Sequence, residues 1–583
     1  MKLALAQVNP TIGDIDGNAR LIERFVRAGH DAGADLVVLP ELAVCGYPPR
    51  DLLLREGFIE ACSSAARRIG QSAPEGITVV LGTPLPAPSE SGGAATGRIT
   101  NSLVAWRDGL PIGRYDKRLL PTYDVFDEDR YFTPGSSPCI IDVPALVGGT
   151  IRVGLAICED LWKGDDAGFA WRYQDSSDPV ADAARHGARV LAVPSASPFV
   201  LGKGARHRDI LRSHARRHAL TVAAVNQVGG NDDLLFDGHS AVFDPNGRLV
   251  AAAPGFAEHL LVTDLAGPPV PAASPIAELP DPLTQAADER LLYEALVTGI
   301  RDYCSKTGFA SCVIGLSGGI DSALTAVLAT RALGAPNVLG IAMPGPYSSD
   351  HAIADARSLA TSLGIAFETI SILDPISGFR SAIDPAFGRL GHEALGRSLP
   401  DLSEENLQSR ARGTVLMAVS NRTGAMVLTT GNKSELAVGY ATLYGDMNGG
   451  LAVLSDITKG RVYALSRWIN AQHHAAGFAS PPIPPSSMQK PPSAELRPNQ
   501  TDQDTLPAYD VLDAIIERFI ERQESPAGIA DRTGIDPALV RRITRMIDLA
   551  EYKRRQAAVG LKVTSVAFGA GRRQPIAQRW IGP

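Results

Sequence analysis

The chain has 583 residues, with 56 Lys and Arg against 63 Asp and Glu, so its formal net charge is −7. Hydrophobic residues make up 45% and charged residues 20%, which excludes an intrinsically disordered chain, and the acidic balance excludes affinity for nucleic acid or a membrane surface through bulk positive charge. A single hydrophobic core stops growing at roughly 250–300 residues, so we expect at least two domains.

The N-terminal segment MKLALAQVNP contains an apolar run that stops at Gln7, which is too short for a signal peptide. No stretch of the chain approaches the roughly 18 consecutive apolar residues that a membrane-spanning helix needs. The six cysteines form no CxxC pair and show no metal-ligand spacing with histidine, as expected of reduced thiols. These features predict a soluble, cytoplasmic protein.

Short apolar segments and amphipathic helices alternate in the first half of the chain. One helix is expected over 18–32, where apolar residues recur with helical spacing. The segment AVFDPNGRLV (241–250) is typical of a β-hairpin with a Pro-Asn-Gly turn. Hairpins mixed with strand–helix units predict sheets with antiparallel members, layered with helices. The expected strands cover 3–8, 36–40, 77–81, 151–158, 190–194 and 221–226.

A proline-rich segment separates the two halves. Residues 266–281 read AGPPVPAASPIAELPD, with five prolines in sixteen residues and neither helical nor strand periodicity. Such a composition is typical of a linker. We therefore expect a first domain over 1–265, a linker over 266–285 and a second domain over 286–583.

The second half alternates strictly between strands and helices. The pattern predicts a strand over 312–316, a helix over 321–333, a strand over 338–343, a helix over 352–363 and a strand over 367–372. This βαβαβ order predicts a parallel sheet with helices on its faces.

The sequence SGGIDS connects the first strand of this half to its helix. Gly318 and Gly319 allow the backbone to approach a ligand closely, and the N-terminus of the helix that follows favours a phosphate. Asp321 is placed to hold a Mg²⁺ ion that bridges phosphates. The loop is not a Walker A motif, and a glycine turn with a Ser or Asp helix cap would explain the same residues.

SGGIDS resembles the pyrophosphate-binding loop of the ATP pyrophosphatases. Four further segments are similar to the NAD synthetase family, and the similarity covers nearly all of 286–583. One departure is MPGP, where many members of the family carry MPSR, because the change removes a possible cation. The four segments are MPGPYSS (343–349), ENLQSRARG (405–413), TTGNKSELAVGYATLYGDMNGGLAVLSDITK (429–459) and EYKRRQAAVGLKVTSVAFG (551–569).

The resemblance implies a Rossmann-like domain of the adenine-nucleotide α-hydrolase type. A lysine or glutamate alone would be read as a surface charge, and it is the matching of four segments that favours a site. The Pro- and Ser-rich segment 481–513 is expected to be a lid, with an inert linker as the alternative. The implied roles are ATP binding by Ser317, Gly318, Gly319, Ile320, Asp321, Ser322, Arg410, Thr430 and Lys459, Mg²⁺ binding by Asp321 and Glu435, and binding of deamido-NAD by Asn406, Asp446 and Lys553.

Cys158, in the segment ICEDLW, is expected at the end of the strand over 151–158. An isolated cysteine is ordinarily a small buried hydrophobe. Thiol chemistry needs a base for the proton and a cation for the oxyanion. Glu41 in LPELAVCGYPPRD and Lys117 in GRYDKRLLPTYDVFDE meet these two needs.

The order Glu, Lys, Cys and the segments around these residues resemble the nitrilase superfamily, over roughly 1–265. The resemblance implies an αββα sandwich in which Glu41 is the general base, Lys117 stabilises the oxyanion and Cys158 forms a thioester. Glu128 matches a second glutamate that orients the lysine. The residues expected to bind glutamine are Tyr123, Phe126, Ser197 and Lys203, although Tyr123 and Phe126 would serve equally well as core aromatics.

Together the two resemblances predict an enzyme that uses ammonia from glutamine and ATP, with Mg²⁺, to convert deamido-NAD to NAD⁺. An adenylated intermediate, release of AMP and pyrophosphate, and an internal route for ammonia are part of this expectation. Both families self-associate, so a homo-oligomer is expected. Two alternatives stay open, namely another ATP-dependent amide ligase with a different acyl acceptor, and a non-catalytic protein.

Overall fold

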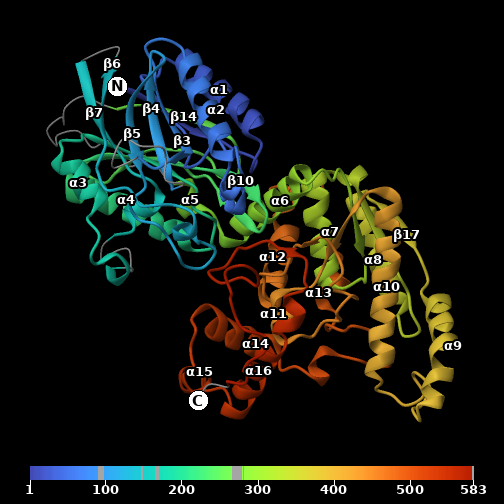
Figure 1. The fold of residues 1–583 in the computed structure, drawn as a ribbon. Coiled ribbons are helices and arrows are strands. Elements are labelled where there is room, and N and C mark those ends of the chain that lie inside the picture. The colour runs from blue at the N-terminus through green and yellow to red at the C-terminus, as the bar shows by residue number, and fades with distance from the viewer. Residues whose placement is uncertain (89–97, 146–148, 164–169, 266–278, 280, 581–583) are drawn as a thin grey trace. The chain divides into compact units, whose positions relative to one another are not determined.

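The computed structural model describes residues 1–88, 98–145, 149–163, 170–265, 279 and 281–580. The chain divides into two compact units, Met1–Ala287 and Asp288–Pro583 (Figure 1). Most of the predicted linker over 266–285 lies outside the described residues. Its last part forms the short helix α5 (Pro282–Gln285) and belongs to the first unit, where Asp281 forms a buried ion pair of 2.9 Å with Arg208. Within the described ranges, no helix combines the length and apolar character needed to cross a membrane.

A two-stranded sheet, β10-β11, and two six-stranded sheets form the first unit. The six-stranded sheets have the strand orders β14-β1-β2-β3-β4-β5 and β13-β12-β9-β8-β7-β6. In each six-stranded sheet a parallel centre is flanked by antiparallel strands, which confirms the expected mixture of hairpins and strand–helix units. The elements of this unit are β1 (Lys2–Gln7), α1 (Ile15–Asp31), β2 (Leu36–Val38), α2 (Phe58–Ser72), β3 (Thr78–Pro86), β4 (Ile99–Arg107), β5 (Leu110–Asp116), β6 (Ile140–Ala145), β7 (Gly149–Leu155), α3 (Pro179–Arg185), β8 (Val190–Ser195), α4 (Lys203–His218), β9 (Thr221–Asn226), β10 (Val228–Asn231), β11 (Leu234–Asp237), β12 (Ala241–Phe243), β13 (Leu249–Ala252) and β14 (His259–Asp264).

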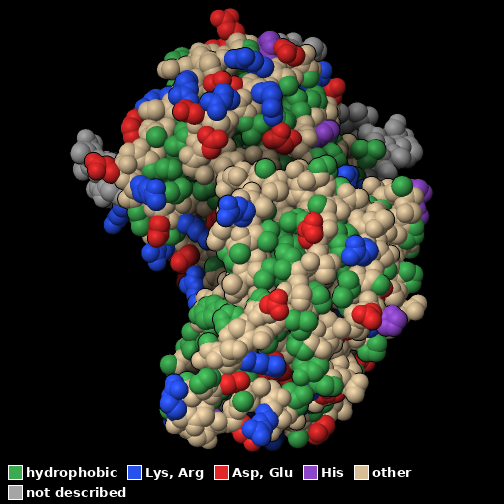
Figure 2. Space-filling model, turned by 90° about the vertical axis from the view of Figure 1, so that its right-hand side faces the viewer, with side chains coloured by type: hydrophobic (Ala, Val, Ile, Leu, Met, Phe, Trp, Pro, Cys, Tyr) green, Lys and Arg blue, Asp and Glu red, His purple; other side chains and the backbone are tan. Residues whose placement is uncertain are grey.

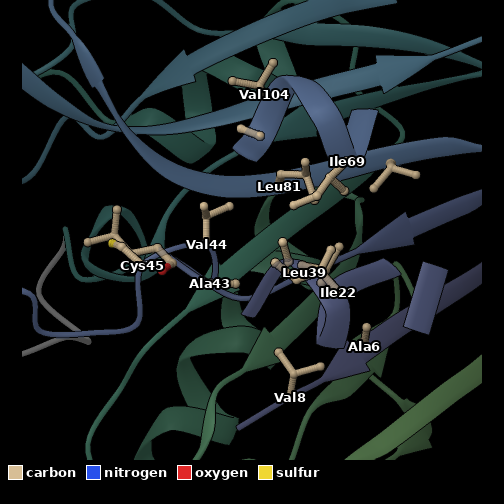
Figure 3. Packing of buried hydrophobic residues seen from close by; sticks show 14 of the residues in the cluster. Ala6, Val8, Ile22, Leu39, Ala43, Val44, Cys45, Ile69, Leu81 and Val104 are labelled. Atoms are coloured by element: carbon tan, nitrogen blue, oxygen red, sulfur yellow. Dashed lines mark hydrogen bonds between the residues drawn. The ribbon is translucent and has the colours of Figure 1, made fainter. Parts of the chain in front are cut away.

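Alternation of side chains along the strands builds the layers of this unit. Leu3 and Leu5 of β1 belong to the core between the two sheets, whereas Ala4 and Ala6 belong to the core under α1 and α2. Figure 3 shows this second core, where Ala6, Leu81 and Val104 of the sheet lie among Ile22 and Ile69 of the helices. A third core lies under α3 and α4 on the other sheet. The order of layers is therefore helix, sheet, sheet, helix, which confirms the αββα sandwich.

A fully parallel six-stranded sheet, in the order β17-β16-β15-β18-β19-β20, forms the second unit. The βαβαβ prediction is confirmed, with strand ends that differ by one to three residues. The elements of this unit are α6 (Asp288–Lys306), β15 (Cys312–Gly315), α7 (Ile320–Leu333), β16 (Val338–Ala342), α8 (Asp350–Leu363), β17 (Ala366–Thr369), α9 (Leu373–Arg389), α10 (Leu402–Thr423), β18 (Met426–Thr429), α11 (Lys433–Val438), β19 (Leu451–Ala452), α12 (Lys459–Ala471), α13 (Pro485–Gln489), α14 (Tyr509–Ile516), α15 (Pro526–Thr533), α16 (Pro537–Leu549), α17 (Glu551–Arg554) and β20 (Val559–Gly560).

The carboxyl ends of the parallel strands position the predicted site residues. In the second unit β16 and β17 lie on one side of β15, and β18, β19 and β20 lie on the other, so the strand order reverses at β15 and the loop 316–319 that follows it lies at this switch point. In the first unit Glu41 follows β2, Cys158 follows β7 and Ser197 follows β8. Ligands of open α/β sheets bind at such edges and switch points, so both groups of residues lie where binding is expected.

The surface carries charge of both signs. On the face that Figure 2 shows, basic and acidic side chains of the described residues are interspersed. All six cysteines are free thiols, and five of them are buried.

Candidate active sites

A buried ion pair joins Glu41 to Lys117 in the first unit. Lys117 Nζ donates to Glu41 Oε1 at 2.7 Å, and both side chains are only 1% exposed. The same carboxylate accepts hydrogen bonds from Asn101 Nδ2 at 2.7 Å and from the backbone N–H of Ala196 at 3.0 Å. Because its lone pairs are directed at three fixed donors, the Glu41 carboxylate is held in one orientation.

Glu128 is the second carboxyl group on Lys117. Its Oε1 accepts from Lys117 Nζ at 2.8 Å and from the hydroxyl of Tyr47 at 2.8 Å. Burial raises the pKa of Glu128 above the usual range, Lys117 opposes the rise and Glu41 adds to it. For Lys117, burial opposes the charge, but Glu128 and Glu41 raise the pKa of the ammonium above its usual value. Lys117 is therefore a permanent cation.

Cys158 lies next to this pair, but not at the end of a strand as predicted. β7 ends at Leu155, and Cys158 begins a 3₁₀ helix, Cys158–Leu161, with φ +40°. The left-handed region is costly for a residue with a Cβ, and such strain is concentrated at functional sites. Burial and the charge of Glu41 raise the pKa of the Cys158 thiol, whereas Lys117 lowers it. The resting group is therefore a thiol that has to lose its proton during attack.

Asp160 connects the loop of the nucleophile to the loop of the lysine. One carboxylate oxygen accepts from the backbone N–H groups of Arg118 and Leu119, at 3.2 and 3.0 Å. The other accepts from the backbone N–H of Ile157 and the hydroxyl of Tyr115, both at 2.8 Å. No motif indicated a role for Asp160, although its position two residues after Cys158 was a signal. Asp160 fixes the separation of Cys158 from Lys117.

Tyr123 and Phe126, both predicted to bind glutamine, pack edge to face with ring centroids 5.4 Å apart. The Tyr123 hydroxyl donates to the carboxylate of Glu159 at 3.0 Å, and the Tyr173 hydroxyl donates to it at 2.6 Å. Glu159 is buried beside Cys158, and no motif indicated a role for it either. A buried carboxylate in this position is suited to hold an ammonium group of a ligand.

Ser197 and Lys203 meet on the same side of the sheet. Lys203 Nζ donates to Ser197 Oγ at 3.1 Å and lies 5.5 Å from the centre of the Trp162 ring. Asn226 fixes the Ser197 backbone by accepting its N–H at 2.8 Å. Lys203 also lowers the pKa of Cys158, so the predicted glutamine residues and the thiol share one electrostatic environment.

In the second unit the SGGIDS loop leads directly into α7. Gly318 has φ +76°, and a Cβ there would lie 2.4 Å from the carbonyl oxygen of Ala352, so the position requires glycine. Gly318 packs against α8 and does not line the cavity at the mouth of the loop. That cavity has a volume of about 300 Å³. The predicted residues that line it are Ser317, Gly319, Ile320, Asp321, Ser322, Thr430, Glu435, Asp446 and Lys459.

Asp321 and Glu435 are brought together by Lys459. Its Nζ donates to Asp321 Oδ2 at 2.5 Å and to Glu435 Oε1 at 3.2 Å. Asn432, which the sequence analysis missed as a site residue, donates to Asp321 Oδ1 at 2.9 Å. Burial raises the pKa of Glu435, Lys459 opposes the rise and Asp321 adds to it. Two carboxyl groups facing a phosphate loop are the donor set that Mg²⁺ prefers when substrate phosphates and water complete its coordination, so these residues fit the ion.

Besides Gly318, three predicted residues lie outside this cavity. Arg410 donates to the carbonyl oxygen of Leu443 at 3.2 Å, Asn406 accepts from the Thr442 hydroxyl at 2.8 Å, and Lys553 donates to the carbonyl oxygens of Gly439 and Ala441 at 2.8 and 2.7 Å. All three therefore contact one segment, 439–443. Asp446, close to that segment, does line the cavity, and burial raises its pKa to about 6.

The predicted lid, 481–513, contributes to the walls of the same cavity. Ser487, in α13, donates to the carbonyl oxygen of Gly318 at 2.9 Å, which connects the segment to the phosphate loop. Lys490 forms an ion pair of 2.5 Å with Glu495, and both line the cavity. The segment contains the short α13 and a 3₁₀ helix, Asp502–Asp504, and its backbone is otherwise irregular up to α14.

Two family models match the chain in succession. The carbon-nitrogen hydrolase model matches residues 2–268, and the NAD synthase model matches residues 292–557. The glutamine-dependent NAD(+) synthetase of Synechocystis sp. is 43% identical over 579 residues, which cover 99% of this chain and 98% of the relative. The enzyme of the same name from Thermotoga maritima is 39% identical, covering 100% of this chain and 99% of the relative. The structure of the glutamine-dependent NAD⁺ synthetase from Acinetobacter baumannii in complex with ADP matches with a TM-score of 0.71 and 36% identity, over 99% of this chain and 98% of that one.

The electrostatic environment of Cys158 predicts how fast it is alkylated as a function of pH. In the native protein the midpoint of the pH–rate profile with iodoacetamide should lie above about 8.5, the ordinary thiol pKa. Glu41→Gln removes a negative charge that disfavours the thiolate, so the midpoint should move to lower pH. Lys117→Gln removes a stabilising positive charge and should move it to higher pH. The mass of the Cys158 peptide after timed quenching measures each rate, Cys158→Ala supplies the background, and an unchanged midpoint in both variants would contradict this electrostatic account.

The four hydrogen bonds of Asp160 predict a second effect. Asp160→Asn replaces an acceptor oxygen by a donor that faces N–H or O–H groups, which should cost about 1–3 kcal/mol of stability and displace Cys158 from Lys117. Hydrolysis of glutamine, the activity that the nitrilase resemblance implies, should fall at least about tenfold in kcat. Asp244→Asn is the matched control, because Asp244 accepts two backbone N–H groups in a turn of the same unit. Equal loss of activity in the two variants would refute a positioning role.

Proposed function

The chain belongs to the glutamine-dependent NAD(+) synthetase family, and we propose that its first unit releases ammonia from glutamine at Cys158 while its second unit uses ATP to convert deamido-NAD into NAD⁺. The observation that carries this proposal is that one chain holds both a buried Glu41–Lys117 pair beside a thiol and an Asp321–Glu435–Lys459 cluster at a glycine loop. The domain limits proposed are those of the sequence, 1–265 and 286–583.

In the first reaction the sulfur of Cys158 attacks the carboxamide carbon of glutamine. Its proton passes to Glu41, since burial keeps the thiol protonated at rest and a base is needed at the moment of attack. The negative charge that develops on the carbonyl oxygen is stabilised by Lys117, whose own charge is secured by Glu41 and Glu128.

The tetrahedral adduct collapses when the C–N bond breaks and the nitrogen leaves with the proton that Glu41 held. Ammonia and a thioester to Cys158 result. Water then attacks the thioester, with Glu41 again accepting a proton, and glutamate is released. Because Asn101 and the Ala196 N–H hold the Glu41 carboxylate in place, the same group can serve both half-reactions.

The head group of glutamine is recognised by residues around the thiol. Tyr123 and Phe126 form one wall, and Ser197 with Lys203 supplies a hydroxyl and a cation for the α-carboxylate. We add Glu159 to the predicted set, because its buried carboxylate suits the α-ammonium group.

In the second reaction the nicotinate carboxylate of deamido-NAD attacks the α-phosphorus of ATP, and pyrophosphate leaves. The backbone N–H groups at the start of α7, with Ser317 and Ser322, bind the phosphates, and Thr430 and Lys459 complete that side of the cavity. Asp321 and Glu435 would hold Mg²⁺, which supplies positive charge for the departing pyrophosphate. Ammonia then displaces AMP from the acyl-adenylate to give the amide.

The dinucleotide acceptor is assigned to the wall formed by Asp446 and the segment 439–443. That segment is contacted by Asn406, Arg410 and Lys553. These residues therefore either hold the segment in position for the acceptor or bind the acceptor on the side of the segment that faces away from the cavity. The lid over 481–513 covers the phosphates, a role supported by the bond from Ser487 to Gly318. Self-association of the chain is also part of the proposal.

A different acyl acceptor is the main competing function. Incubating the protein with ATP, ammonium and a panel of carboxylic acids, and measuring AMP, separates the two, because only the true acceptor supports stoichiometric AMP release. The non-catalytic alternative predicts no pyrophosphate with any acid.

The division of labour predicts opposite effects of two substitutions. Cys158→Ala removes the nucleophile, so glutamine-dependent synthesis of NAD⁺ should fall at least about a thousandfold. Synthesis from ammonium chloride should stay within about twofold of the wild-type rate, because the thiol takes no part in it. Asp321→Ala should abolish synthesis from either nitrogen source.

Chromatographic measurement of NAD⁺ and AMP reads both effects, and circular dichroism checks that each variant is folded. A folded Cys158→Ala protein that fails equally with glutamine and ammonium would show that the proposed division is wrong.

A further inference from the structure

Arg412 of α10 lines the nucleotide cavity of the second unit, and neither motif analysis nor the proposed roles assign it a task. Its Nε donates to the carbonyl oxygen of Met343 at 3.0 Å, which fixes the plane of the guanidinium at the carboxyl end of β16. Within the described part of the chain, its two Nη groups donate no hydrogen bond. A fixed guanidinium with two available donors has the geometry that binds an oxyanion in a bidentate manner.

The other two basic side chains that line this cavity are already neutralised. Lys459 is bonded to both Asp321 and Glu435, and Lys490 is paired with Glu495 at 2.5 Å. Arg412 has no carboxylate within ion-pair distance among the described residues. Cations that are shielded from water are normally paired, so an unpaired one in a substrate cavity indicates that the substrate supplies the anion.

The surroundings of Arg412 are shaped for it. Burial lowers its pKa to about 10, with Glu495 and Asp446 opposing the effect at longer range, so the group stays charged at neutral pH. A Cβ at Gly345 would lie 3.0 Å from Arg412 Nη2 and 3.2 Å from Ile372, so glycine there leaves the space that the guanidinium occupies. The segment MPGPYSS (343–349) has no basic residue of its own, and α10 provides the positive charge next to it.

The proposed adenylation reaction needs a positive charge, not neutralised by a protein carboxylate, next to the α-phosphoryl group of ATP. When the carboxylate oxygen bonds to the α-phosphorus and the bond from that phosphorus to the bridging oxygen breaks, the electron pair leaves with pyrophosphate. The α-phosphoryl oxygens keep their negative charge throughout and approach a second anion, the carboxylate. Lys459, matched by two carboxyl groups, contributes no net positive charge there, whereas Arg412 does.

We propose that Arg412 binds the α-phosphoryl oxygens of ATP and of the acyl-adenylate, and so promotes the adenylation step. This inference rests on the proposed function. It distinguishes Arg412 from the residues of the glycine loop, which face the leaving pyrophosphate.

The test is exchange of labelled pyrophosphate into ATP in the presence of deamido-NAD, which reports adenylation alone and needs no ammonia. Arg412→Gln should lower the maximal exchange rate about a hundredfold, the size expected for losing a charge-assisted pair. Arg412→Lys should lower it about tenfold, because an ammonium keeps the charge but not the bidentate geometry. Methylguanidinium added to Arg412→Ala should restore part of the rate. Arg422→Gln, an exposed arginine of the same helix, is the matched control and should exchange at the wild-type rate.

The other outcomes separate the possibilities. An Arg412→Gln protein that exchanges at the wild-type rate, or whose defect is confined to a higher KM for deamido-NAD, overturns the inference. A loss explained by a lower melting temperature and not rescued by Arg412→Lys or methylguanidinium also overturns it. No exchange by the wild-type protein would overturn the proposed function itself, and this inference with it.

Discussion

The buried ammonium group of Lys117 is the interaction on which the first unit depends. A cation that is 1% exposed is tolerated only with carboxyl partners at hydrogen-bond distance, and Lys117 has two, at 2.7 and 2.8 Å. Those partners come from separate loops, after β2 and near residue 128, so meeting this electrostatic requirement fixes three segments relative to one another. Asp160 then extends the same fixed frame to the loop of Cys158. These ion pairs and hydrogen bonds therefore restrain the loops of the site relative to one another.

The second unit also contains a lysine between two carboxyl groups, but there the carboxyl groups are more exposed. Lys459 also bridges two carboxyl groups, but Asp321 and Glu435 keep 17% and 19% of their side chains exposed to the cavity, whereas Glu41 and Glu128 keep 1% and 5%. A closed cluster suits a reaction whose charge develops and disappears on one small substrate. An open one suits ligands that bring several charges with them. Exposure of the carboxyl groups therefore separates the cluster that we propose for proton transfer from the cluster that we propose for phosphate and Mg²⁺.

The sequence was sufficient for the order of elements and for the residues of the motifs, because local patterns determine both. Strand alternation, the Pro-Asn-Gly hairpin and the turn at Gly318 each depend on residues close in the chain. Asp160, Glu159 and Arg412 were missed because their roles arise from contacts across the fold, such as Asp160 with residues 118–119. The opposite difficulty, a predicted binding residue that lies outside the cavity, applies to Asn406, Arg410 and Lys553. Their motif places them near a substrate, but a motif cannot distinguish contact with a ligand from support of the segment 439–443 that forms a wall.

The charge balance of the nucleotide cavity explains how an acidic protein can accept polyanions. Among the described residues that line it, five carboxyl groups face three basic groups, a formal excess of two negative charges. Burial offsets part of this excess, because it raises the pKa of Glu435, of Asp446 to about 6, and of Asp502. The remainder still opposes a triphosphate unless cations enter with it. The excess negative charge of the cavity therefore disfavours a bare polyphosphate. It favours a polyphosphate that brings cations for the carboxyl groups and whose α-phosphoryl oxygens contact Arg412, as we propose.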